Sequence, residues 1–200
     1  RGVVPLSDGA GQVLAVGEGV SDLAPGDIVA SCFYPHWEAG PATATNHSAS
    51  LGCEMDGQLR KTATLPASAF IRAPGHLTSS EAATLPCAAV TAWAALLTRG
   101  CLIPGEHVLV QGTGGVAVFA VQFAKAMGAT VTVISSSDEK LSKIRELGAD
   151  YTVNYREHPQ WSDRVNELLD GENIDLAIEL GGAVTLAQTL QCIRVGGRIS

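Results

Sequence analysis

The chain has 200 residues, of which 46% are apolar and 16% are charged, and its formal net charge is −7 with a pI near 5.1. This composition is typical of a soluble globular chain that can bury a substantial core as one large domain or two small ones. The acidic balance and the lack of any basic run longer than two residues argue against binding to a nucleic-acid backbone or to an anionic membrane surface.

Five scattered cysteines and the absence of a targeting pattern set the expected compartment. The cysteines are Cys32, Cys53, Cys87, Cys101 and Cys192, and none forms a Cys-x-x-Cys pair. This spacing predicts free thiols rather than a structural zinc cluster or a thioredoxin-type motif. No signal-peptide pattern and no apolar run of about eighteen residues is present, so we expect a cytoplasmic protein without a membrane span.

Residues 1–77 read as short strands separated by turns. The strand candidates are Gly11–Val20, Ala24–Ser31, Gln58–Pro66 and Ala69–Pro74. Between them, Cys32–Gly57 has little periodicity and is predicted to be a long loop. The stretch 78–99 is predicted to be helical and to connect two domains. It opens on a capping box formed by Thr78 and Glu81, is interrupted by Pro86, and resumes over Cys87–Gly100 with Gly100 as the C′ residue.

From residue 100 to residue 200 strands alternate with helices. The predicted strands are His107–Gln111, Thr130–Ser135, Tyr151–Tyr155, Ile174–Leu180 and a last one in Gly196–Ser200. The predicted helices are Val116–Met127 closed by Gly128, a helix opening on a capping box at Ser136–Glu139 that buries Leu141, Ile144 and Leu147, Trp161–Leu169 and Val184–Cys192. This alternation predicts an α/β domain with a Rossmann-type, doubly wound parallel sheet. The chain stops inside its fifth strand, so we expect the natural protein to continue.

The turn after the first of these strands carries a phosphate-binding pattern. Gly112-x-Gly114-x-x-Ala117 lies between a strand and a helix, as in dinucleotide-binding folds. Gly112 permits the tight turn, Gly114 lets a pyrophosphate approach, and Ala117 lets the helix pack closely. The helix N-terminus then offers unpaired N–H groups to the phosphates. The candidate cradle is Gly112, Thr113, Gly114, Gly115 and Val116; the alternative is a plain strand-to-helix turn.

The residues after the second strand favour NADP over NAD. An NAD site usually has an acidic residue there to hold the ribose 2′-hydroxyl. This chain has Ser135, Ser136 and Ser137, followed by Lys140, and these groups suit a 2′-phosphate. The alternative is that the serines only cap the helix. The missing acid also weighs against an S-adenosylmethionine-dependent methyltransferase, which normally has one at the same place.

The whole chain resembles the medium-chain dehydrogenase/reductase superfamily. The resemblance rests on Asp8–Val20, Pro25–Val29, Glu81–Leu96, Gly112–Ala129, Ser137–Tyr155 and Gly196–Ser200, which occur in the family's order. It implies part of a GroES-like catalytic domain over 1–77, connecting helices over 78–99 and a Rossmann domain over 100–200 whose C-terminal part is missing. It also implies an active site in the cleft between the domains, and a homo-oligomer, either a dimer or a tetramer.

Departures from the family pattern indicate a zinc-independent branch, similar to quinone oxidoreductases and to zinc-free alcohol dehydrogenase-like reductases. Ser7 stands where zinc alcohol dehydrogenases have a histidine ligand, and serine is a poor zinc ligand. Cys87 matches a family zinc ligand, but one thiolate does not make a site. The family's four-cysteine structural zinc lobe would fall in the loop from Cys32 to Cys53, and that set of four cysteines is absent. His36 and His47 in this loop are expected to be solvated. The expectation is therefore no zinc.

The resemblance also assigns cofactor contacts. Ser135, Ser136, Ser137, Lys140 and Tyr155 match positions around the 2′-phosphate in NADPH-dependent quinone oxidoreductases, and Arg156 adds another charge. Thr91 matches a position near the nicotinamide. Leu180 and Gly181 follow the fourth strand and are expected beside the cofactor, since ligands bind at the carboxyl ends of the strands.

The predicted reaction is hydride transfer from NADPH to a quinone, an enone or another activated carbonyl, because no Lewis acid is expected to polarise a simple carbonyl. No catalytic residue is assigned. Asp8 is a candidate acid, with a structural hydrogen-bond partner as its alternative. Phe33, Tyr34 and Trp37 either line an acceptor pocket or pack the long loop. The alternative function is an NADP-binding module with vestigial catalysis and a structural or redox-sensing role.

Overall fold

The computed structural model describes residues 2–200. Arg1, the first residue of the expected N-terminal domain, lies outside the described residues. The chain divides into two compact units, Arg1–Ala88 and Ala89–Ser200, and the division falls inside the expected connecting stretch 78–99. Across the described part of the chain, every helix falls short of the length and apolar character that a membrane crossing requires.

The first unit contains a small antiparallel sheet of order β1-β2-β3. Its strands are β1 (Ala10–Gln12), β2 (Ile28–Ser31) and β3 (Phe70–Arg72), which follows a 3₁₀ turn at Ala67–Ala69. The predictions near Ala24–Ser31 and Ala69–Pro74 are confirmed, and Cys32–Gly57 is a long loop without a regular helix or strand. The prediction over Gly11–Val20 was too long and the one over Gln58–Pro66 was wrong, because β2 is the central strand and both its edges are taken by β1 and β3.

The helical stretch that follows begins as predicted and then departs from α geometry. The capping box of Thr78 and Glu81 opens α1 (Ser79–Ala82). The chain then forms a π-helix over Leu85–Ala89, α2 (Val90–Trp93) and a second π-helix over Ala94–Arg99. The helical path thus continues through Pro86, which has no N–H to donate, by a change of hydrogen-bond spacing.

Gly100 ends this stretch for a reason other than the one predicted. Its φ is −73°, and the left-handed residue is the next one, Cys101, with φ 48°. A Cβ on Gly100 would lie 2.6 Å from Leu176 Cδ2 and 2.7 Å from the carbonyl oxygen of Leu96. Glycine is required here because a Cβ would crowd the carbonyl oxygens of the preceding helical turn, Ala95 and Leu96, as well as Leu176 of β7, rather than because the backbone turns left-handed.

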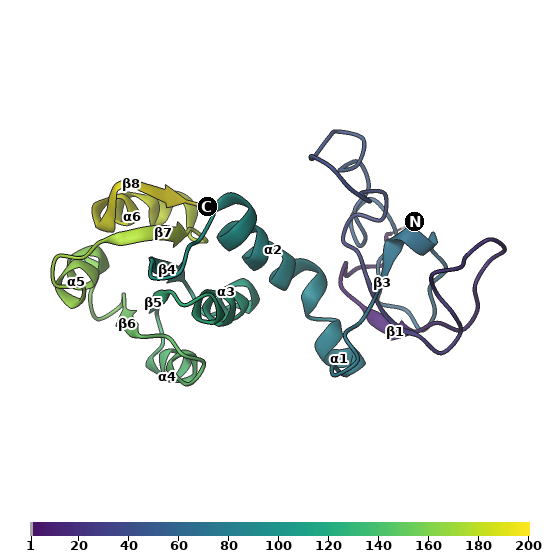
Figure 1. Cartoon of the computed structure of the whole chain (residues 1–200), viewed down its shortest axis with the longest axis horizontal. Helices are drawn as coiled ribbons and strands as arrows, with labels where there is room; N and C mark the ends of the chain where they lie inside the picture. The colour runs from purple at the N-terminus through teal and green to yellow at the C-terminus, as the bar shows by residue number, and fades with distance from the viewer. Residues whose placement is uncertain (1) are drawn as a thin grey trace. The chain divides into compact units, whose positions relative to one another are not determined.

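The second unit is the predicted doubly wound domain, with a parallel sheet of order β6-β5-β4-β7-β8. Its strands are β4 (His107–Gln111), β5 (Thr130–Ser135), β6 (Tyr151–Asn154), β7 (Ile174–Ile178) and β8 (Ile193–Ile199). Its helices are α3 (Gly115–Ala126), α4 (Asp138–Glu146), α5 (Trp161–Leu168) and α6 (Leu186–Cys192), with a 3₁₀ turn at Gly182–Val184. Figure 1 shows α3 and α4 on one side of this sheet and α5 and α6 on the other.

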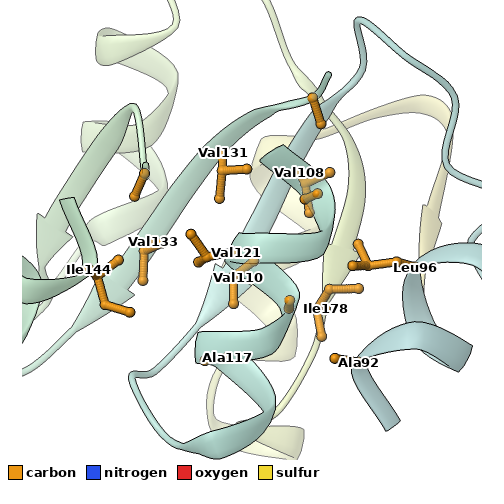
Figure 2. Close-up of a cluster of buried hydrophobic side chains, with 14 of the residues drawn as sticks. Ala92, Leu96, Val108, Val110, Ala117, Val121, Val131, Val133, Ile144 and Ile178 are labelled. Carbon is orange, nitrogen blue, oxygen red and sulfur yellow. The ribbon is translucent and has the colours of Figure 1, made fainter. Parts of the chain in front are cut away.

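Alternate residues of the buried strands supply two cores. In β4, Val108 and Val110 belong to the core beneath α3, whereas Leu109 between them belongs to the core beneath α5 and α6. Figure 2 shows the first core, where Ala117 and Val121 of α3 meet the valines of β4 and β5. This packing fixes the end of β4 and the start of α3, which bracket the glycine-rich turn.

Two details of the predicted helix over 138–146 and the length of the predicted last strand differ from the structure. Helix α4 is capped by Ser137, whose hydroxyl accepts from the Lys140 N–H at 3.4 Å, so the capping box expected at Ser136–Glu139 is wrong by one residue. Leu141 and Ile144 are buried as predicted, but Leu147 is 41% exposed because it is the C-cap beyond the last turn. The last strand is longer than predicted and bulged, and a Cβ on Gly197 in it would lie 2.6 Å from Ile193.

Candidate nucleotide-binding site

The strand order places a topological switch point between β4 and β7. The chain winds outward from β4 to β5 and β6, then returns to place β7 on the other side of β4. Ligands of open α/β sheets bind outside the carboxyl ends of the strands at such a point. A cavity of about 500 Å³ lies there, and its walls include Gly112 after β4, Leu180 and Gly181 after β7, and Tyr155 after β6.

The turn after β4 is built to receive an anion. Gly112 has φ 79°, and Gly114 is the N-cap of α3 with no side-chain capping bond. The first N–H groups of α3 therefore have neither an intrahelical nor a side-chain acceptor. A Cβ on Gly114 would meet nothing within 4 Å, so the space over these N–H groups is open. Ala117 is fully buried against the sheet, as the fingerprint requires.

The N–H groups of the turn after β7, unlike those at the start of α3, are paired with a carboxylate. The N–H groups of Gly181 and Gly182 donate to Glu179 Oε1 at 2.9 and 3.0 Å. A carboxylate thus already occupies the donors that an anionic ligand would use. The Gly112 N–H donates to the Ile134 carbonyl at 2.7 Å, but the first N–H groups of α3 have no acceptor, so an anionic ligand would be favoured on the β4 side of the cavity.

The ends of β5 and β6 bring the predicted ribose-side residues together. Ser135 is 4% exposed and lies 3.4 Å from Thr113 between their hydroxyl oxygens. The Tyr155 N–H donates to the Ser135 carbonyl at 3.0 Å, which sets Tyr155 beside the second strand. Ser136 is half-buried and follows directly, while Ser137 is used as the helix cap. No acidic residue stands at the end of β5 itself, and the Asp138 carboxylate accepts from Asn154 Nδ2 at 3.0 Å.

Two exposed cations flank these strand ends, and the charge of one of them, Lys140, helps to lower the pKa of the neighbouring Glu139 carboxyl. Lys140 and Arg156 are both exposed, and across residues 2–200 neither side chain forms an ion pair or hydrogen bond. Thr91 lies elsewhere in the second unit, exposed on α2, and is not among the residues that line the cavity.

Two polar residues that sequence reasoning missed lie at the centre of the site. Gln111 ends β4 and Glu179 directly follows β7, and the two side chains are hydrogen-bonded at 2.6 Å. Burial and hydrogen bonding act in opposite directions on the Glu179 carboxyl. Burial alone would raise its pKa, but the hydrogen bonds from Thr185, Thr189 and Gln111 outweigh it and leave the pKa below the ordinary value. The available signal was a polar residue ending each of two otherwise apolar, adjacent strands.

In the first unit the structure brings Ser7, Asp8 and Cys87 together. The Asp8 carboxylate accepts from the Ser7 hydroxyl at 2.8 Å with one oxygen and from the Cys87 backbone N–H at 3.3 Å with the other. Both oxygens are engaged, which is the geometry of a structural partner. Across residues 2–200, no group of three or more His, Cys, Asp or Glu side chains is placed to hold a metal ion.

The aromatic residues of the long loop pack on one another. Tyr34 stacks on His47 with ring centroids 4.6 Å apart and an interplanar angle of 5°. Phe33 lies edge-on to Tyr34 at 4.7 Å, and Trp37 contacts His47 at 4.8 Å. These contacts favour the loop-packing alternative for the three aromatics. His47 is exposed, as is His36, but its ring contacts were not anticipated.

Comparison with known families covers both units. An alcohol dehydrogenase GroES-like domain model matches residues 1–75, and a zinc-binding dehydrogenase model matches residues 115–200. A zinc-type alcohol dehydrogenase-like protein of Schizosaccharomyces pombe is 48% identical over 99% of this chain and 58% of its own length. An acryloyl-coenzyme A reductase of Metallosphaera sedula is 32% identical over 94% of the chain and 56% of its own length.

Solved structures of dehydrogenases resemble this chain over nearly its whole length. A putative alcohol dehydrogenase from Sinorhizobium meliloti has a TM-score of 0.92 and 44% identity, over 98% of this chain and 58% of that one. An NAD-dependent alcohol dehydrogenase has a TM-score of 0.87 at 34% identity, covering 98% and 59% of the two chains. A mycobacterial protein complexed with NADPH has a TM-score of 0.77 at 30% identity, covering 97% and 55%. The chain therefore belongs to the medium-chain dehydrogenase/reductase superfamily, and it spans somewhat more than half the length of these relatives.

Proposed function

We propose that the protein is an NADPH-dependent oxidoreductase that transfers hydride to a quinone, an enone or another activated carbonyl without catalytic zinc. The observation that carries this proposal is the pairing of an uncapped glycine turn with a second strand that ends in Ser135 rather than in an acid. The turn suits a pyrophosphate, and the missing acid removes the group that would repel a 2′-phosphate.

The charges at the edge of the site support NADP over NAD. Lys140 and Arg156 are exposed next to the ends of β5 and β6, where their charges could meet a phosphate. Ser136 and Tyr155 would add hydroxyl donors at the ends of β5 and β6. Related structures do not settle the choice, because one is described as NAD-dependent and another is complexed with NADPH.

The proposed acceptor follows from Ser7, which stands where zinc alcohol dehydrogenases have a histidine ligand. NADPH, when bound, supplies the hydride. An activated acceptor such as an enone takes hydride without a Lewis acid, and acryloyl-coenzyme A, named for one relative, belongs to that chemical class. The residues of this chain would then contribute binding, orientation and exclusion of water, with water supplying the proton.

The alternative is a dinucleotide-binding module without turnover, acting as a structural or redox-sensing protein. It is favoured by the engagement of both Asp8 oxygens in hydrogen bonds, which suits a structural role for that residue better than a catalytic one. Both proposals predict the same cofactor site, since binding motifs persist without chemistry.

The test is to incubate the full-length protein with NADPH and a quinone, an enone or an aldehyde. Oxidation of NADPH is measured as the loss of the reduced-nicotinamide absorbance. Turnover with a quinone or enone supports the reductase. Tight NADPH binding without turnover on any acceptor supports the module instead, and tighter binding of NADH than of NADPH contradicts the cofactor assignment. Lys140→Ala and Arg156→Ala should weaken NADPH binding while leaving NADH binding unchanged.

We also propose that the protein is a homo-oligomer, either a dimer or a tetramer, from the family resemblance. The free thiols support the proposal that it is cytoplasmic. Sedimentation of the full-length protein would test the first part of this proposal.

A further inference from the structure

The carboxyl ends of β4 and β7 are joined by a pair of polar side chains that hydride transfer does not require. Gln111 is 4% exposed, and its Nε2 donates to Glu179 Oε2 at 2.6 Å and to Thr189 Oγ1 at 2.8 Å. The Thr189 hydroxyl in turn donates to Glu179 at 2.6 Å. Buried polar groups cost free energy unless they are paired, and this pair is fully satisfied.

The same two side chains hold every N–H of the turn that follows β7. Gln111 Oε1 accepts from the N–H groups of Leu180 at 3.2 Å and Gly181 at 3.0 Å. Glu179 Oε1 accepts from Gly181 and Gly182, and also from the Thr185 hydroxyl. The turn itself is tightly packed, because a Cβ on Gly181 would lie 2.6 Å from Thr185 Cγ2.

This turn is one wall of the cavity at the switch point, opposite the glycine turn of β4. Gln111, Gly112, Leu180, Gly181 and Thr185 all line the same space. The Leu180–Gly181 backbone therefore forms part of the cavity wall. The carboxylate also accepts the N–H groups that would otherwise compete with Gly112–Val116 for a phosphate.

We propose that Gln111 and Glu179 are positioning residues for the dinucleotide, which hold the Leu180–Gly182 turn in register and direct the pyrophosphate to the Gly112–Val116 turn. Neither side chain needs to touch the reacting atoms. The inference rests on the proposed nucleotide-binding function and adds the residues that shape its site.

The pair can be tested by exchanging its chemistry. Glu179→Gln sets the amide of residue 179 against the amide of Gln111, so that two donors face each other. Gln111→Glu sets two carboxylates together at the 2.6 Å contact. Each single variant should raise the Kd for NADPH about tenfold, because a partner in a buried network is lost. For Gln111→Glu the loss should lessen as the pH falls, since protonation of one carboxyl restores a donor.

The reciprocal double variant, Gln111→Glu with Glu179→Gln, restores a donor facing an acceptor and leaves acceptors for all three turn N–H groups. Its Kd should lie within about threefold of the wild-type value, a non-additivity that independent sites would not give. Glu167→Gln is the matched control, because it removes an exposed carboxylate paired with Arg164 on α5. Thermal unfolding of each variant shows that binding is measured on folded protein.

Amide hydrogen exchange at Gly181 and Gly182 supplies a readout without cofactor. Exchange should be slow in the wild type and the double variant and faster in both single variants. Single variants that bind NADPH like the wild type, or a double variant no better than the singles, would overturn the inference. A wild-type protein that binds neither NADPH nor NADH would overturn the proposed function and this inference with it, and the exchange rates would then show only whether the pair orders the turn.

Discussion

The hydroxyl oxygens of Thr113 and Ser135 lie 3.4 Å apart and join the glycine turn after β4 to the end of β5. This relationship places the expected pyrophosphate site and the expected ribose site side by side on adjacent strands. In the proposed site, the residue that would discriminate NADP from NAD therefore lies next to the proposed phosphate cradle.

Ser135→Asp should reverse the cofactor preference. The new carboxylate would stand at the end of the second strand, where it can accept from a ribose 2′-hydroxyl and repels a 2′-phosphate. We expect NADPH affinity to fall at least about tenfold relative to NADH, measured by titration calorimetry with both cofactors. Ser142→Asp, which adds the same charge on the exposed side of α4, should leave the ratio unchanged. An unaltered ratio in Ser135→Asp would contradict the proposed ribose site.

Gly114→Val should abolish dinucleotide binding with little loss of stability. Gly114 has φ −81°, which any residue adopts, and a Cβ there meets nothing within 4 Å. The added side chain would instead fill the space over the N–H groups of α3. Circular-dichroism melting and NADPH titration of the same sample separate the two effects, and a variant that still binds NADPH normally would argue against the cradle.

Gly100→Ala should show the reverse pattern. Its Cβ would be forced against Leu176 and the carbonyl of Leu96, so we expect a loss of about 1–3 kcal/mol in the free energy of unfolding. Gly100 does not line the cavity, so the folded fraction should bind NADPH normally. Chemical denaturation measures the loss, and an unchanged midpoint would be inconsistent with the close packing on β7.

Asp175 should contribute an acid-sensitive part of the stability. Burial alone would raise its pKa, but hydrogen bonds from the His107 N–H and the Arg194 guanidinium outweigh it and lower the pKa below 3.8. Because the folded pKa is depressed, the contribution is present above pH 3.8 and is lost as the pH falls through the folded pKa. Asp175→Asn should therefore lower stability at neutral pH and flatten its decline below pH 4, as followed by urea denaturation at several pH values.

Cys192 should resist alkylation in the folded protein. It is fully buried, and burial raises the pKa of its thiol to about 11, whereas Cys53, Cys87 and Cys101 are exposed. Since the thiolate is the reactive form, iodoacetamide at neutral pH should label the three exposed cysteines. Cys192 should stay unlabelled until denaturant is added. Peptide mass spectrometry reports each site, and rapid labelling of Cys192 in native protein would show that α6 opens easily.

Much of the fold and of the site was predictable from local patterns. Residues that alternate in β4 or repeat along α3 must bury their apolar faces wherever the elements lie, so the order of strands and helices in the second unit was determined by the sequence. The glycine turn was determined in the same way, because the tight turn and open approach are properties of Gly112 and Gly114 themselves. The short first-unit strands were less predictable, since pairing with β2 decided which apolar stretches became strands.

Only the tertiary structure decided the remainder, since it depends on contacts between distant residues. Gln111 and Glu179 are 68 positions apart and become partners because the strand order makes β4 and β7 neighbours. Asp8 meets Cys87, 79 positions away. The sequence by itself determined which turn has the glycine pattern of a phosphate site. The pairing of β7 with β4 decided which residues form the Leu180–Gly182 side of the cavity, because hydrogen bonds between distant strands leave no pattern in the local sequence.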